Sequence, residues 1–90
     1  MKQTFIGEEH RVQIVAFDMT GESVPESLRK LKPVFSVSIL PITANKSTPF
    51  YRGEQVYYGE GFGAAWGVLR AWVDNPKLVM PRRWKRFKGN

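Results

Sequence analysis

The feature that most constrains the fold of this chain is the spacing of apolar residues in the segment 61–74, GFGAAWGVLRAWVD. Steps of i, i+3, i+4, i+7, i+10 and i+11 place six apolar side chains on one stripe of an α-helix. Two of the six are tryptophans, and each buried aromatic ring removes roughly 150–250 Å² from water. The spacing therefore predicts a helix over 61–74 that covers the core of a small domain. The stripe consists of Phe62, Ala65, Trp66, Leu69, Trp72 and Val73.

Strands are predicted ahead of this helix from runs of β-branched and aromatic residues. Residues 2–6 and 11–19 form one predicted pair, and apolar side chains on both sides of 11–19 indicate a central strand. Residues 34–42 alternate clearly between apolar and polar, and Pro41 indicates either the end of that strand or a sheet edge. Residues 50–52 and 55–58 are predicted to form a tight hairpin, with Tyr57 on the face opposite to its neighbours.

A second helix is predicted over residues 24–32. A serine and a glutamate in capping-box spacing come before apolar residues at i, i+4 and i+7, and these three residues, Val24, Leu28 and Leu31, are expected to face the core. The order of elements predicts an α+β fold, a small two-layer sandwich. Its antiparallel sheet has four or five strands, and both helices lie on one face.

The chain is predicted to be one domain with a basic tail. Ninety residues suffice for a single core. Residues 1–80 carry nine Lys/Arg and eight Asp/Glu, whereas residues 81–90 carry five cations and no acid. We therefore predict a single α+β domain over 1–76 and a basic, aromatic-containing C-terminal tail over 77–90.

The composition argues against several classes of protein. The chain has no cysteine, which excludes disulfides, thiolate metal sites and a cysteine nucleophile. Its N-terminal residues lack the apolar run of a signal peptide, and no window approaches the ~18 apolar residues that span a bilayer. We expect a soluble, cytoplasmic protein.

The predicted tail combines cations with aromatic rings, and this combination predicts nucleic-acid binding. Cations follow a phosphate backbone, while indole and phenyl rings stack on bases. Lys46 and Arg52, in the loop and hairpin nearby, are expected to extend the basic track. The predicted phosphate contacts in the tail are Arg82, Arg83, Lys85, Arg86 and Lys88, and the predicted stacking or inserting rings are Trp84 and Phe87.

Other partners fit the same sequence. An acidic protein ranks second and a tail that only keeps the protein soluble ranks with it, while an anionic membrane ranks last because the tail lacks a sustained apolar face. The aromatic cluster Phe50, Tyr51, Arg52 and Tyr57 suits a protein partner, since tyrosine and arginine are frequent hot-spot residues. On that alternative the chain is an interaction module, such as a small viral or mobile-element inhibitor or adaptor. A homodimer, paired through the strand near Pro41, is the third alternative.

No residue pattern predicts an active site. The segment 59–64 matches a loose G-x-G-x-x-A phosphate pattern, but Glu60 repels anions and the chain is too short for a dinucleotide-binding fold. His10, the only histidine, has no second metal ligand or nucleophile nearby and is expected to be a surface residue. We therefore predict a binding protein that is not an enzyme, with no catalytic residue, cofactor or metal.

From Pro25 onward the predicted order is similar in topology to double-stranded RNA-binding domains, which run helix, three strands, helix. That family places lysines at the start of its second helix, where they contact phosphates. This chain has Phe62, Gly63, Ala64 and Ala65 there. The similarity is one of element order, and membership of that family does not follow from it.

Overall fold

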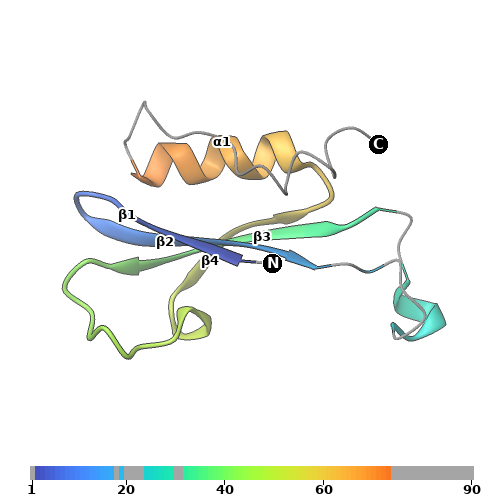
Figure 1. The fold of residues 1–90 in the computed structure, drawn as a ribbon, viewed down its shortest axis with the longest axis horizontal. Coiled ribbons are helices and arrows are strands. Elements are labelled where there is room, and N and C mark those ends of the chain that lie inside the picture. The colour runs from blue at the N-terminus through green and yellow to red at the C-terminus, as the bar shows by residue number, and fades with distance from the viewer. Residues whose placement is uncertain (1, 18, 20–23, 30–31, 74–90) are drawn as a thin grey trace.

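The computed structural model of the protein describes residues 2–17, 19, 24–29 and 32–73. It is a small α+β domain in which one helix lies across one face of an open four-stranded antiparallel sheet (Figure 1). The strands follow one another across the sheet in chain order: β1 (Lys2–Ile6), β2 (His10–Phe17), β3 (Val34–Pro41) and β4 (Glu54–Gly59). The helix α1 spans Phe62–Val73, and two short 3₁₀ helices, η1 (Glu26–Leu28) and η2 (Phe50–Arg52), lie in the connections.

β2 is a central strand, as its sequence predicts. Its residues Val12, Ile14 and Ala16 are buried beneath α1, while Val15 and Phe17 point to the other side of the sheet. The strand pairs with β1 along one edge and with β3 along the other. The predicted strands over 2–6, 11–19 and 34–42 are confirmed, with bounds that differ by two residues at most.

The core lies between the sheet and α1, and the apolar stripe fills it. Five of the six stripe residues are buried and Trp72 is half-buried. The Trp66 ring meets Phe5 of β1 edge-on, with 5.9 Å between ring centroids, and stacks with Phe62 at 5.9 Å. Phe62 in turn meets Phe35 of β3 at 5.1 Å. These aromatic contacts tie α1 to two strands and confirm the predicted helix and its buried side.

The prediction of a second helix over 24–32 is wrong for the residues described there. η1 covers three residues, and none of them is buried. Leu28 is 56% exposed, so the apolar spacing does not mark a core face, and Leu31 lies outside the described residues. The backbone is extended at Arg29, where the turn ends. A segment this short needs tertiary packing to hold a helix, and α1 already covers the core side of the sheet.

The prediction of a strand over 50–52 is also wrong, because these residues form η2. The amide of Arg52 donates to the carbonyl of Pro49 at 3.0 Å, and the amide of Gly53 donates to that of Phe50 at 2.9 Å. Pro49 has no amide hydrogen for a strand ladder, and its carbonyl closes a helical turn instead. β3 and β4 are therefore joined by the longer connection 42–53. Among the described residues, two strands lie between η1 and α1 where double-stranded RNA-binding domains have three, so the similarity does not extend to the described fold.

A β-bulge in β4 changes which side chains face the core. Val37 pairs with Tyr57 and Ser38 with Gln55, which leaves Val56 as an extra residue. Val56 and Tyr57 therefore both pack against the core, and the predicted alternation between them is wrong. Tyr58 points to the other side, opposite Ser36, and is 58% exposed.

β3 ends at Pro41 and lies between β2 and β4, so the prediction of a strand end is right and that of a sheet edge is wrong. Both sides of β3 are paired, and a homodimer would need the outer edge of β1 or β4. The predicted tail over 77–90 lies outside the described residues. Within the part of the chain that is described, no helix combines the length and apolar character needed to cross a bilayer.

We predict that Leu69→Ala lowers the free energy of unfolding by about 2–5 kcal/mol, because a fully buried leucine leaves a cavity under α1. Urea denaturation followed by circular dichroism measures this change. The control is Gly67→Ala on the exposed side of the same helix, where an added Cβ has no atom within 4 Å. That change should raise stability by up to about 1 kcal/mol, as alanine replaces glycine in a helix interior. Equal effects from the two substitutions would contradict the assignment of the buried side.

Candidate functional site

The face of the sheet turned away from α1 is the candidate functional site, and we call it the open face. Its strand residues alternate with those that pack under the helix. Cross-strand pairing brings polar side chains to its middle, since Gln13 lies opposite Ser38 on β3. The strand residues of the open face are Lys2, Thr4, Ile6, Arg11, Gln13, Val15, Phe17, Val34, Ser36, Ser38, Leu40, Gln55 and Tyr58.

The connection 42–53 forms a wall on this side of the sheet, opposite to α1 (Figure 1). Arg11 holds the connection in place, because its Nη2 donates to the carbonyl of Ala44 at 2.6 Å and to that of Asn45 at 3.1 Å. The amide of Ile42 donates to the carbonyl of Glu9 at 2.8 Å, which extends the β2–β3 pairing into the connection. The wall is thus attached to β2 by side-chain and backbone hydrogen bonds.

Gly53 lets η2 approach β3 closely. A Cβ atom at this position would overlap the carbonyl oxygen of Ile39 and lie 3.0 Å from the Leu40 side chain. Only glycine fits without displacing η2. Leu40 is 3% exposed although it points away from α1, so the end of the connection buries part of the open face.

Beside η2 the open face forms a groove of about 350 Å³ that spans β2, β3 and β4. Aromatic rings with large exposed fractions line it, Phe17 at 44% and Tyr51 at 83%. Its polar lining includes Gln55, whose Nε2 donates to Ser36 Oγ at 2.8 Å. The full lining of this open-face groove is Gln13, Val15, Phe17, Ser36, Ser38, Phe50, Tyr51, Gly53 and Gln55.

The groove also presents hydrogen-bonding groups. Gln13 donates through Nε2 to Thr4 Oγ1 at 3.2 Å, and Gln55 donates to Ser36. Among the described residues, the amide oxygen of each glutamine and the hydroxyl of Ser38 have no hydrogen-bond partner. These atoms are therefore open to a ligand that carries N–H or O–H donors.

Charge is distributed unevenly around the open face. Lys2 and Arg11 lie on it, and Lys46 and Arg52 are exposed on the connection that walls it. In the described strands, no carboxylate lies on this face. The described carboxylates lie in the β1–β2 turn, in η1, at the start of β4 and ahead of α1; they are Glu8, Glu9, Glu26, Glu54 and Glu60. The local excess of cations favours an anionic ligand.

The structure brings together some of the residues that the sequence singles out and separates others. Phe50 and Tyr51 line the open-face groove, and Lys46 and Arg52 lie on the same connection. Tyr57 does not join them, because it packs toward the core and its hydroxyl donates to the carbonyl of Gly61 at 3.1 Å. The tail residues Arg82, Arg83, Trp84, Lys85, Arg86, Phe87 and Lys88 lie outside the described residues.

Sequence reasoning missed the strand residues of the groove. Phe17, Gln13 and Gln55 did not stand out, because single aromatic or amide residues in strands are common. The usable signal was the alternation in 34–42, where Ser36 and Ser38 share one side. Polar residues at alternate positions of a central strand indicate that this side is not fully covered.

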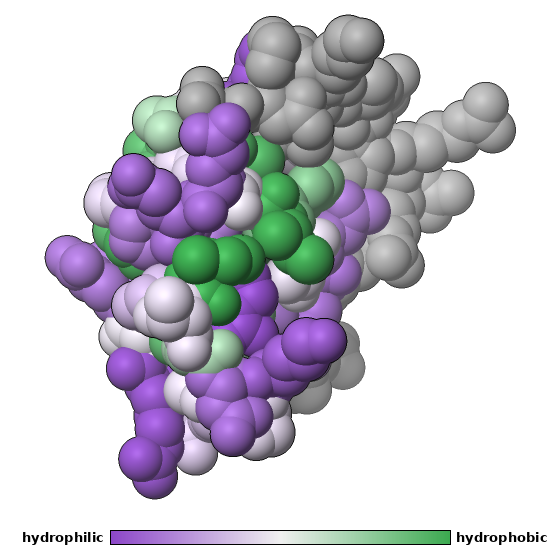
Figure 2. Space-filling view, turned by 90° about the vertical axis from the view of Figure 1, so that its left-hand side faces the viewer, coloured by the Kyte–Doolittle hydropathy of each residue, from purple (hydrophilic) through white to green (hydrophobic). Residues whose placement is uncertain are grey.

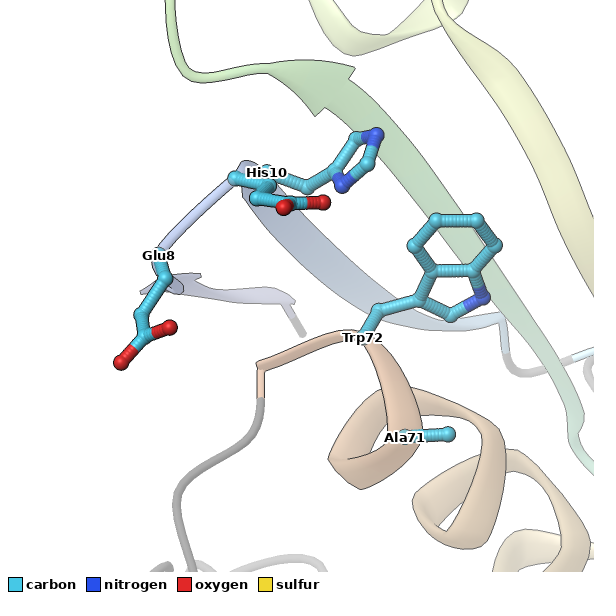
Figure 3. Close-up of a pocket in the computed structure, with 5 residues that line it drawn as sticks. Glu8, His10, Ala71 and Trp72 are labelled. Atoms are coloured by element: carbon cyan, nitrogen blue, oxygen red, sulfur yellow. The ribbon is translucent and has the colours of Figure 1, made fainter.

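His10 lies in a second hollow, of about 310 Å³, at the other side of the sheet (Figure 3). Its ring meets Trp72 of α1 edge-on, with 4.7 Å between centroids, while the Glu8 side chain points away from both. His10 is half-buried by this contact, so the expectation of a simple surface residue is only partly right. Among the described residues, no group of three His, Cys, Asp or Glu side chains is placed to hold a metal ion. The contact joins the start of β2 to the last turn of α1.

The end of the molecule that carries the β1–β2 turn shows a small band of hydrophobic surface framed by hydrophilic side chains (Figure 2). Two exposed aliphatic side chains lie close to this turn in the chain or by hydrogen bonding: Ile6, at the end of β1, is 73% exposed, and Ile42, whose amide donates to the carbonyl of Glu9, is 40% exposed. Exposed apolar side chains of this kind suit the edge of a contact surface.

No known protein family, no curated protein and no solved structure matches this chain. The site is therefore interpreted from its own residues.

We predict that Gly53→Ala lowers the free energy of unfolding by about 1–3 kcal/mol, because the added methyl group overlaps the Ile39 carbonyl and forces η2 off β3. Thermal or urea denaturation measures the change. Gly63→Ala is the matched control, since a Cβ there meets no atom within 4 Å. If Gly53→Ala unfolds at the same denaturant concentration as the parent protein, the close packing of η2 on β3 is not a feature of the protein in solution.

Proposed function

We propose that this chain is a small non-catalytic nucleic-acid-binding protein. The observation that carries the proposal is the carboxylate-free open face of the described strands, flanked by Lys2, Arg11, Lys46 and Arg52. Arg11 donates to backbone carbonyls, so no carboxylate among the described residues offsets its charge. A surface of this kind attracts phosphates and other anionic groups. A cytoplasmic location, where nucleic acid is abundant, is part of the proposal.

The sequence of the tail supports the same function. Five cations between 82 and 88 supply the salt-dependent part of the affinity, because each phosphate contact releases counterions. Trp84 and Phe87 add rings that stack on bases or insert between them. In this proposal the tail provides most of the attraction and Lys46 and Arg52 extend it along the backbone of the nucleic acid.

The competing function is a protein-interaction module, such as an inhibitor or adaptor that binds an acidic or host protein. The exposed side chains of Tyr51, Ile6 and Ile42 favour this alternative, since large exposed apolar side chains anchor protein partners. The absence of carboxylates from the open face of the described strands suits nucleic acid and an acidic protein alike. Nucleic acid is favoured by the sequence of the tail, in which aromatic rings that can stack on bases alternate with cations.

We predict that the full-length protein binds labelled oligonucleotides, and that glutamine at Arg82, Arg83, Lys85, Arg86 and Lys88 lowers the slope of log K against log salt concentration by up to about one per cation that contacts a phosphate. Fluorescence anisotropy at about 50 and 200 mM salt measures both slopes. Trp84→Ala with Phe87→Ala should weaken binding and leave the slope in place.

If the chain is instead a protein-interaction module, we expect no salt-sensitive binding to oligonucleotides. If the parent protein shows no salt-sensitive binding to single strands or duplexes, the nucleic-acid function is wrong. Capture of one protein that survives nuclease treatment and depends on Tyr51 would then support the alternative.

A further inference from the structure

We infer that the open-face groove is a stacking site for the bases of single-stranded nucleic acid. This inference rests on the proposed function and adds the form of nucleic acid that is bound and the surface that binds it. The basic tail accounts for attraction to phosphates and does not by itself distinguish single strands from duplexes. The groove does, because its rings reach only bases that are not already stacked and paired.

The first observation is the exposure and placement of aromatic rings. Tyr51 is 83% exposed on η2 and Phe17 is 44% exposed on β2, and both line the groove. Phe50 lines it as well and is half-buried. Exposed rings on a sheet or beside it offer faces for bases, and such stacking tolerates any base because every base has a π-face.

The second observation is that polar side chains with free hydrogen-bond acceptors line the groove together with the aromatic rings. Gln13, Gln55 and Ser38 present oxygen atoms that have no partner among the described residues. The exocyclic amino groups and ring N–H groups of unpaired bases are donors of the matching kind. Ser36 is 6% exposed and accepts a hydrogen bond from Gln55, which holds that amide in place in the groove.

The third observation is the positive charge around the groove, which favours the phosphate backbone of a nucleic-acid strand as the ligand. Lys46 and Arg52 are exposed on the connection beside the groove, and Lys2 and Arg11 lie on the same face of the sheet. None of the four forms an ion pair with another described residue. A strand whose bases enter the groove therefore carries its phosphates past uncompensated cations.

The rigidity of the groove fits this role. Gly53 allows η2 to lie close against β3, and the Arg11 hydrogen bonds hold the connection to β2. Tyr51 is thus presented by an anchored turn on a paired sheet, which limits the conformational entropy lost when a base stacks on it.

The test uses the full-length protein and fluorescein-labelled oligomers of about 12 nucleotides, one single-stranded DNA, one single-stranded RNA and one duplex. We expect the single strands to bind more tightly than the duplex. Tyr51→Ala should weaken single-strand binding about 5- to 100-fold, while Tyr51→Phe, which keeps the ring, should stay within about two-fold of the parent. Phe17→Leu, which keeps an apolar side chain but removes the ring, should weaken it to a smaller extent.

Controls separate the groove from the tail. Tyr51→Ala should leave the salt slope and the duplex affinity unchanged, because stacking releases no counterions. Leu28→Ala removes an exposed apolar side chain that does not line the groove and should have no effect. The urea midpoint of each variant shows that the fold is intact, and Tyr51 is exposed enough that little change is expected.

Two negative results have different meanings. If the parent protein binds no oligonucleotide, the proposed function fails and the inference fails with it. If it binds single strands and duplexes equally, or if Tyr51→Ala and Phe17→Leu bind like the parent, the proposed function stands through the tail and the groove is not a base-binding site. Loss of a protein partner on Tyr51→Ala, with unchanged oligonucleotide binding, would also overturn the inference.

Discussion

The structure depends on the packing of one helix against one side of a four-stranded sheet. Trp66 and Phe62 connect α1 to Phe5 and Phe35, and the buried residues of β2 and β3 complete the core. A chain of this length buries too little surface to build a second core. The other side of the sheet therefore has no second core and depends on individual contacts. These are the hydrogen bond from Arg11 to the connection 42–53, the close packing of η2 on β3 at Gly53, and hydrogen bonds between polar side chains. These same features create the open face and its groove.

The parts of the fold that follow from local periodicity were predictable. The i, i+3, i+4, i+7 stripe identified α1 and its buried side, and apolar residues on both sides of 11–19 identified the central strand. The predictions were wrong where the sequence of a short segment fits two local structures and contacts with the rest of the fold decide between them. The apolar residues of 24–32 fit a helix, but α1 already covers the core side of the sheet and Leu28 remains exposed. Val56 and Tyr57 break strict alternation, because a bulge depends on pairing with β3 and not on the sequence of β4 alone.

The candidate site was predictable only in part for the same reason. Phe50, Tyr51 and Arg52 were visible as a cluster with Lys46 in the loop nearby, although the sequence placed the first three on a hairpin and not on a 3₁₀ turn. The groove needs three strands to be brought side by side, and Gln13, Ser36 and Gln55 are 19 or more residues apart. No local pattern encodes such a juxtaposition. The sequence indicated the groove only through Ser36 and Ser38, which lie on the same side of β3.

In the proposed function, the open face and the tail would contribute to different parts of one binding reaction. Attraction by the five cations of the tail acts over about a Debye length, ~8–10 Å at physiological salt, and weakens steeply as salt is added. Stacking on Tyr51 requires contact and is nearly independent of salt. A protein that used only the tail would bind any polyanion, whereas one that used only the groove would associate slowly and weakly. In the proposed function, the two together would give fast capture followed by selection of unpaired bases, with the sheet supplying the selective step. On this proposal the close packing of η2 at Gly53 would have a functional reason as well as a structural one, because a surface that selects ligands by shape must keep its ring in place before the ligand arrives.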